Sequence, residues 1–245
     1  MNNKKSFLIS VATLCLMLSS FCLSSQIFIG ASCGTTGNKF VDFNKDDNYI
    51  AEYKLKNGKC FSAFFDVPHD TAMALRIGFQ YDHNHACLDI LNNAGNFSFY
   101  KNICYSFNRI SIDFDYFSCL NKENRIQIKP FFGVNMSLVI NTKSDGFGWN
   151  NIYQTQLDSS GNQIVVITTE NWEKNEQHSK DMFPINFGIN VGFEMMFPFT
   201  VKCDFIIQNK YNLFLTNLLK SDDLKFTSFL SGGINLGFRY EIGRN

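Results

Sequence analysis

The chain has 245 residues, with 22 basic and 22 acidic side chains and therefore no formal net charge at pH 7. Because there is no basic excess, the charge pattern does not support nucleic-acid binding. The composition includes 27 Phe and only 4 Pro, which favours a β protein, since aromatic residues suit strands and proline interrupts them.

The N-terminus has the pattern of a secretory signal. Lys4 and Lys5 precede an apolar stretch over residues 7–18, and small residues follow as far as Ser25. We expect residues 1–25 to be a signal peptide and residues 26–245 to form one domain. The mature domain would carry 20 basic and 22 acidic side chains, a net charge of −2. An uncleaved anchor helix is the alternative, although the stretch is short for a span of about 20 residues.

The rest of the chain alternates between apolar and polar residues, which is typical of strands with one apolar face. Eight segments show this pattern: 27–34, 58–67, 73–82, 107–118, 126–140, 183–197, 199–211 and 225–243. Cys33 and Cys203 fall on the apolar faces. The last segment is longer than an ordinary strand of about 5–6 residues. It exceeds the roughly 9–11 tilted residues that cross a membrane.

The connections between these segments alternate in length. Outer-membrane barrels join their strands by short periplasmic turns and long external loops. Here the long connections are 35–57, 83–106, 141–182 and, less so, 212–224, and the short ones are 68–72, 119–125 and 197–199. The sequence therefore predicts an all-β fold, an eight-stranded antiparallel up-and-down transmembrane β-barrel in the bacterial outer membrane. Its expected partners are outer-membrane lipid and the barrel assembly machinery.

A soluble, exported barrel or sandwich is the competing interpretation, with the apolar faces turned inward. Two features favour the membrane. The polar faces are rich in Gly and small polar residues, which suit a crowded interior, whereas the apolar faces carry large Phe, Ile and Leu.

Five segments resemble the outer-membrane β-barrel families of Bacteroidetes, the porin-family or PorT-like barrels, and more distantly the small OmpA/OmpX type. They are 73–81 (MALRIGFQY), 109–116 (RISIDFDY), 129–136 (KPFFGVNM), 186–192 (NFGINVG) and 233–240 (GINLGFRY). The resemblance spans nearly the whole mature chain. Such barrels often end on an aromatic residue, whereas Asn245 is last here. The resemblance implies a location and a fold, and it says little about activity.

The predicted lumen carries charges of both signs. An eight-stranded interior is just wide enough to be filled by side chains, and buried charges need partners. We therefore expect a closed lumen rather than an open pore. The inward charges are Arg76, Arg109, Asp113, Asp115, Lys129, Glu194, Lys202, Asp204, Arg239 and Glu241.

The longest connection is the strongest candidate for a binding site. Residues 151–156 and 163–169 flank 157–162 (LDSSGN), a pattern that predicts a hairpin. Trp149 and Trp172 bracket this hairpin, and together with Tyr153 they are candidates for contact with a surface ligand or protein partner. Aromatic packing that merely stiffens the loop is the alternative.

Other sites are less clearly marked. His83 and His85, with Asp82 and Cys87 nearby, are candidates for a metal site at the outer rim, and a solvated loop is the simpler interpretation. Cys87 and Cys104 flank one loop and could form a disulfide in an oxidising compartment. No nucleophile elbow or zinc-protease helix motif occurs. No cofactor is expected.

Three functions remain open at this point. The first is a small non-enzymatic barrel with a binding or structural role at the cell surface. The second is a narrow channel or a secretion accessory barrel. The third is an outer-membrane enzyme that uses rim residues such as Asp82, His83 and His85.

Overall fold

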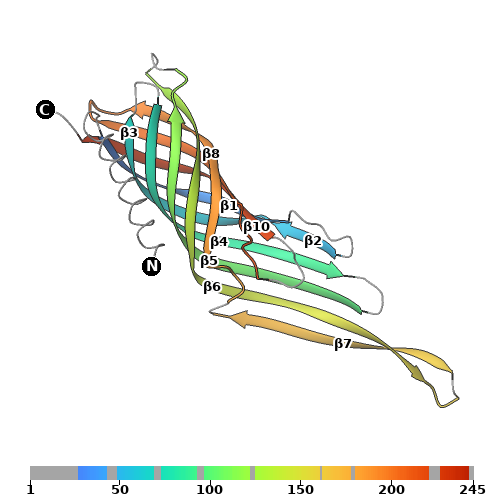
Figure 1. The fold of residues 1–245 in the computed structure, drawn as a ribbon. Helices are drawn as coiled ribbons and strands as arrows, with labels where there is room; N and C mark the ends of the chain where they lie inside the picture. Colours follow the sequence, from blue (N-terminus) through green and yellow to red (C-terminus); the bar gives the residue numbers. More distant parts are fainter. Residues whose placement is uncertain are drawn as a thin grey trace, which may run out of the picture.

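The protein is described by a computed structural model over residues 27–42, 49–68, 73–92, 97–121, 125–160, 162–177, 180–220 and 227–242. The expected signal peptide and its cleavage site lie outside these ranges. Within them there is no helix long and apolar enough to cross a membrane. The described elements are ten β-strands (Figure 1). They are β1 Ile27–Asp42, β2 Tyr49–Lys54, β3 Lys56–Pro68, β4 Met73–Asn92, β5 Phe97–Ser118, β6 Gln127–Leu157, β7 Gln163–Glu176, β8 Ile185–Pro198, β9 Cys203–Phe214 and β10 Thr227–Ile242.

Eight of these strands close into a ring. The antiparallel order is β1, β3, β4, β5, β6, β8, β9 and β10, and β10 pairs again with β1. The closing pair extends from Ile27 opposite Ile242 to Asp42 opposite Thr227. Closure leaves no unpaired sheet edge in the ring, which is the condition for strands to lie in lipid. The predicted eight-stranded barrel is confirmed.

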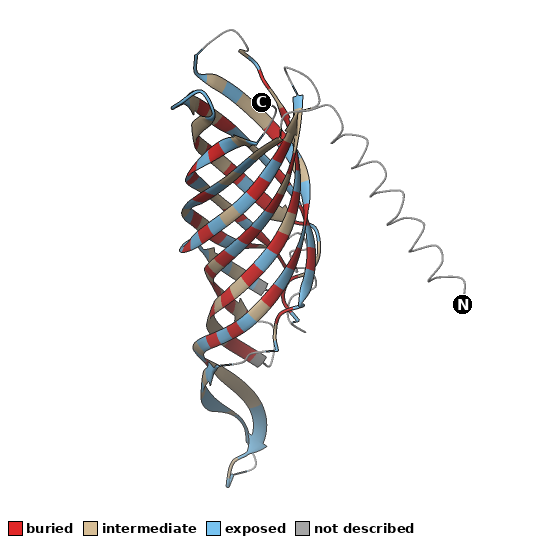
Figure 2. Cartoon of the chain, turned by 90° about the vertical axis from the view of Figure 1, so that its left-hand side faces the viewer, coloured by how far each residue is buried: buried red, intermediate tan, exposed pale blue. Residues whose placement is uncertain are grey.

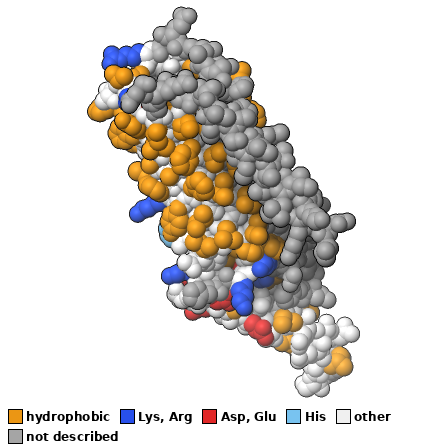
Figure 3. Space-filling view, turned by 60° about the vertical axis from the view of Figure 1, so that its left-hand side comes forward, with side chains coloured by type: hydrophobic (Ala, Val, Ile, Leu, Met, Phe, Trp, Pro, Cys, Tyr) orange, Lys and Arg blue, Asp and Glu red, His pale blue; other side chains and the backbone are white. Residues whose placement is uncertain are grey.

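The outward surface of the ring is apolar. Buried and exposed residues alternate along each strand (Figure 2), and large apolar side chains cover the outside (Figure 3). Phe132, Val134 and Phe238 are 64%, 56% and 52% exposed, whereas inward-facing Asn135 and Asn190 are buried. A soluble barrel would bury the first set and expose the second, so that alternative is wrong. An apolar outside around a polar interior is the pattern of an outer-membrane β-barrel, and the protein is one.

Four strands are much longer than predicted. β1 has 16 residues and continues to Asp42, past its predicted end at residue 34. β4, β5 and β6 have 20, 22 and 31 residues, so most of 83–106 and the first part of 141–182 are strand rather than loop. Beyond the apolar belt the outward side chains become polar, while the buried inward side chains change from polar to apolar, as at Leu88, Ile90 and Phe99. The amphipathic pattern thus reverses along one strand, and a search for one continuous apolar face misses the continuation.

The strand predicted at 199–211 begins later, at Cys203. Residues 199–202 form a turn in which the backbone N–H groups of Phe199 and Thr200 both donate to the carbonyl of Cys203. Phe199 and Val201 are 73% and 97% exposed there. Lys202 also lies in this exposed turn rather than in the lumen. Apolar and polar residues alternate through this turn in the same phase as in β9, so the sequence pattern does not separate the turn from the strand.

A β-bulge at Asn141 divides β6 into two parts. Asn141 has a φ of 51°, a left-handed conformation that Asn tolerates better than most residues. The pairing with β5 shifts by one residue here, between Phe107 and Asn108. Odd-numbered residues such as Val139 face inward before the bulge, and even-numbered residues such as Thr142 do so after it. Beyond the bulge β6 runs into a projecting hairpin with β7 (Figure 1).

The orientation of the belt predicts the cost of a charge placed on it. Val134 and Ile167 are each 56% exposed, but Val134 lies in the middle of the belt and Ile167 lies on the projecting hairpin. Val134→Arg should lower the free energy of unfolding in bilayers by about 2–4 kcal/mol, and Ile167→Arg should change it much less. Urea titration of the refolded proteins measures both. Equal effects would mean that Val134 does not face lipid.

Candidate functional site

One group of ion pairs fills the part of the lumen near the 199–202 turn. Arg76 bonds Asp66 at 2.5 Å and Glu194 at 2.6 Å, and the three side chains are at most 4% exposed. Arg239 bonds Asp204 at 2.8 Å and reaches Asp66 at 3.4 Å. Four strands besides β4 therefore meet at these charges. Because each ion has lost its hydration, only the partner ions and their hydrogen bonds compensate for it.

A second group of ion pairs lies further along the lumen. Lys210 bonds Asp113 at 2.9 Å and Asp115 at 3.1 Å. Arg109 donates to Asp82 through both Nε and Nη2. These contacts agree with the expected closed lumen, in which inward charges pair across it.

Some members of these groups were not predicted. Asp66 and Lys210 were missed, although both lie in phase with inward residues of their strands, Phe64 and Gln208. Lys129 is half-buried beside Met196, with its Nζ 3.6 Å from the sulfur atom, and has no ion pair to a described carboxylate. Glu241 is half-buried at the end of β10, beside the 199–202 turn.

The opposite end of the lumen is closed by an apolar cluster. The rings of Phe40, Phe107 and Phe214 pack around Phe229 with centroid separations of 5.9, 5.2 and 6.0 Å. The guanidinium of Arg109 lies 4.5 Å from the ring centre of Phe214 and joins the ion pairs to this cluster. The gap lined by Phe107, Arg109, Phe214 and Phe229 has no room for a water molecule. Met182, Leu218 and Leu219, from the connections flanking β8 and β9, complete the cluster.

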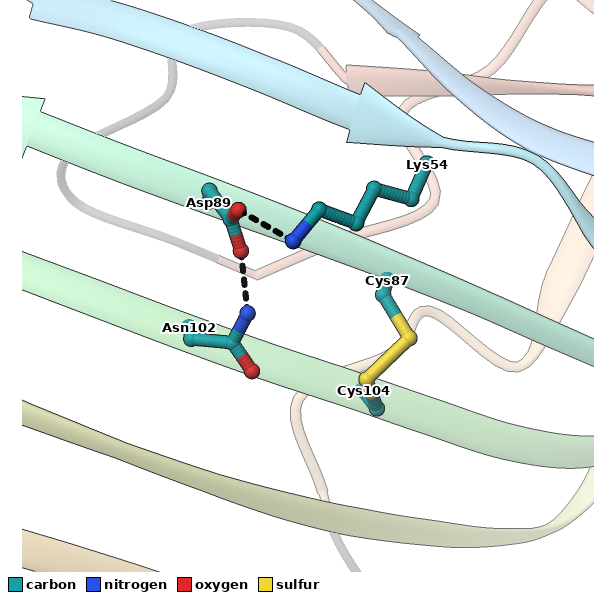
Figure 4. The surroundings of a disulfide bond; sticks show 5 residues. All are labelled: Lys54, Cys87, Asp89, Asn102 and Cys104. Carbon is teal, nitrogen blue, oxygen red and sulfur yellow. Dashed lines mark hydrogen bonds and ion pairs between the residues drawn. A yellow bond between two sulfur atoms is a disulfide. The ribbon is translucent and has the colours of Figure 1, made fainter.

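Beyond this cluster, five strands continue as an external sheet. β2 pairs with β4 and follows the line of β3, and β7 pairs with β6. On its outward face, Cys87 and Cys104, which the sequence allowed to pair, form a disulfide that joins β4 to β5 (Figure 4). Beside it, Lys54 bonds Asp89 at 2.6 Å and Asn102 donates to the same carboxylate. Covalent and ionic contacts thus tie β2, β4 and β5 together outside the membrane.

The predicted hairpin is confirmed, but its two Trp residues lie on opposite faces. Trp172 is directly opposite Gly148, and Trp149 is opposite Asn171. Residues paired across two strands share a face, and adjacent residues do not. Gly148 makes space for the indole, since a Cβ at this position would lie 2.5 Å from the Trp172 ring.

Trp149 and Tyr153 share the outward face. Tyr100 lies there too, with its ring centre 6.5 Å from Trp149 and 6.1 Å from Phe147. The Tyr153 hydroxyl is 3.3 Å from the hydroxyl of Ser98. We call Tyr100, Phe147, Trp149 and Tyr153 the aromatic face. Neither Tyr100 nor Phe147 was predicted, because Tyr100 lies in the connection expected at 83–106 and Phe147 lies between the strand predicted to end at 140 and the hairpin predicted from 151.

His83 and His85 lie on the outward side of β4, just above the apolar belt. Their rings are 4.6 Å apart, and His83 Nδ1 is 2.7 Å from Asn108 Oδ1. Partial burial, then the nearby His83 and Lys56, lower the pKa of His85. Asp82 points the other way, into the lumen, so the rim residues of the enzyme hypothesis do not converge. Among the described residues no group of three or more His, Cys, Asp and Glu side chains is arranged for a metal ion.

A hollow of about 450 Å³ opens beside these histidines. It lies next to the disulfide and is bordered by the base of β7. Its lining combines basic, acidic and neutral polar groups: Lys56, His85, Cys87, Cys104, Tyr105, Ser106, Lys143, Ser144, Asp145, Asn175, Glu176 and Gln177.

No protein-family model and no curated protein match the chain. Similar solved structures include neisserial surface protein A, at 12% identity over 88% of this chain and 97% of that one, with a TM-score of 0.40. The attachment invasion locus protein Ail of Yersinia pestis is 11% identical over 87% of this chain and 98% of that one, with a TM-score of 0.38. The outer membrane protease OmpT of Escherichia coli is 9% identical over 90% of this chain and 99% of that one, with a TM-score of 0.49. At these values the likenesses carry no argument about function, and the fold rests on the strand pairing itself. The PorT-like resemblance stays a prediction.

The ion pairs of the lumen predict a position-dependent cost for one substitution. Asp82→Asn leaves Arg109 buried without a counter-ion and should destabilise the protein by about 3–5 kcal/mol. Asp89→Asn is the matched control, since it breaks the Lys54 ion pair, whose lysine is exposed to water, and should cost far less. Equilibrium unfolding in detergent micelles compares them. Similar costs would mean that Arg109 has access to water.

The disulfide predicts a local effect of reduction. Without the Cys87–Cys104 bond, the external parts of β4 and β5 should open more often, because only strand pairing and side-chain contacts then hold them. Hydrogen exchange should speed up at residues 87–104 and stay unchanged in the belt. A Cys87→Ser, Cys104→Ser variant controls for effects of the reductant. Acceleration throughout the barrel would show that the bond supports the whole fold.

Proposed function

We propose that the protein is a non-enzymatic surface-binding protein, in which a closed barrel anchors an external sheet that contacts a partner. The observation that carries this proposal is the contrast between the two parts. Paired charges and an apolar cluster fill the lumen, whereas the external sheet presents aromatic side chains to solvent. A chain selected for transport through the lumen would have no use for a buried apolar cluster at its end.

The aromatic face has the composition of a protein-binding surface. Aromatic residues supply much of the binding energy at protein interfaces, because they bury a large area with few rotatable bonds. Within this face Phe147 is 55% exposed, and Tyr100 and Trp149 beside it are half-buried. Their partial burial holds the rings in place, so that little conformational freedom is lost on binding.

β7 adds a second means of contact. Among the described residues it pairs only with β6, so its other edge is open. Ile164, Val165 and Ile167 near the tip are 43%, 64% and 56% exposed. An open, β-branched edge strand readily pairs with an extended segment of another protein. The aromatic face and this edge together favour a protein partner over a small molecule.

Neither alternative function has comparable support. A channel would need a continuous path past Arg109 and Phe229, which the packing fills. An enzyme would need converging polar groups, and Asp82 is separated from His83 and His85 by the strand itself.

The two Trp residues provide a test of which face binds. Trp149→Ala should abolish binding of intact, protein-displaying cells to arrayed extracellular proteins, and Trp172→Ala should leave it nearly unchanged. Both variants lose an indole from the same hairpin, so they are matched for size and location. Surface immunofluorescence controls for display. Equal losses in the two variants, or no binding by wild-type cells to any arrayed protein or glycan, would contradict the proposal.

A further inference from the structure

We propose that the outer rim of the barrel carries a binding site for the phosphate groups of an outer-leaflet lipid. This site is separate from the aromatic face and does not depend on the proposed function. It consists of Lys59, His83, His85 and Lys143, together with the adjoining hollow. Basic side chains border the apolar surface of the barrel (Figure 3).

The strand register places these groups in two successive rows. The first row runs across three strands, with Lys59 paired to His83 and His83 paired to Asn108. The second row joins His85 to Ser106 and Ser106 to Lys143. All of these residues face outward, so the four basic groups form one patch on the surface of β3, β4, β5 and β6.

The apolar belt ends directly below the patch. Phe61 pairs with Tyr81, and Tyr81 pairs with Ile110, one outward row nearer to the membrane. These side chains are 55%, 44% and 45% exposed. A lipid whose acyl chains lie against this row has its headgroup at the level of Lys59 and His83. Basic side chains at this depth attract anionic headgroups.

The basic groups are available for a ligand. Within the described ranges neither Lys59 nor Lys143 forms an ion pair with a carboxylate. Two acidic residues, Asp145 and Glu176, line the hollow. The carboxylate of Glu176 already lies 3.6 Å from the Nζ atom of Lys174. Partial burial is the main cause of the lowered pKa of His85, and the nearby His83 and Lys56 lower it further.

The charged row of Lys59 does not extend onto the neighbouring strands β1 and β10. Followed in the other direction, the row of Lys59 continues through Thr35 on β1 to Ile234 on β10, and neither residue is charged. A general preference for basic residues at the interface would surround the barrel. A cluster that stops at β3 and lies beside a hollow indicates a site for a particular headgroup, and phosphate fits because it accepts several charge-assisted hydrogen bonds.

Lipid binding by the purified protein tests this assignment. The probe is diphosphoryl lipid A in zwitterionic detergent micelles, and binding is measured by native mass spectrometry across a titration. A Lys59→Gln, Lys143→Gln variant should bind about tenfold more weakly than the wild type, because charge-assisted hydrogen bonds are lost. The matched control is Lys39→Gln, Lys54→Gln, which removes two external lysines outside the patch, the exposed Lys39 on β1 and the ion-paired Lys54 on β2. Its binding should stay within about twofold of wild type.

Three further measurements separate the possible outcomes. Gel migration with and without heating shows whether each variant is folded, and all should be. Monophosphoryl lipid A should bind more weakly than the diphosphoryl form, and free inorganic phosphate should not compete. Equal loss in the two double variants, or none in either, would overturn the site. Full competition by inorganic phosphate would show that the ligand is a soluble anion, and would overturn the lipid assignment.

Discussion

The structure depends on one constraint, that backbone N–H and carbonyl groups in lipid must find partners within the protein. The pairing of β1 with β10 meets it, because it closes the sheet and removes the last free edge in the membrane. Closure with eight strands then leaves a narrow interior. The polar face of every strand turns into that interior, so charges such as Arg76 and Lys210 must bond carboxylates inside it. The outward belt and the paired lumen are thus two consequences of the same closure.

Outside the membrane the constraint is relaxed, because water can bond to a free strand edge. β4, β5 and β6 therefore continue well past the belt, and β7 adds to β6 with its far edge open. The inward face of this extension is still protected from water, since Leu88, Ile90 and Phe99 pack into the apolar cluster that closes the lumen. The rigid barrel therefore supports an external sheet whose outward side chains are free to differ in chemistry from the belt below.

The sequence was sufficient to predict the eight strands of the ring, the face that meets lipid and the hairpin, and it allowed the Cys87–Cys104 bond without deciding it. These follow from alternation, loop length and cysteine position, which are local properties. The two faces of the hairpin were not predictable, because they depend on pairing register. One extra residue at Asn141 reverses the facing of β6, and it places Trp149 beside Tyr100, about fifty residues earlier in the chain. The lumen partners of Arg109 and Lys210 likewise depend on which strands become neighbours across the barrel.

The central claim is that the membrane part is sealed and that function resides outside it. Current across planar bilayers containing the purified protein tests this claim most directly. The paired charges and the Phe229 cluster predict no steady conductance at any moderate voltage. The same should hold after reduction of the disulfide, since this bond lies outside the lumen. Steady ohmic currents comparable to those of a general porin would contradict the account, because they would require an open path where the structure has packed side chains.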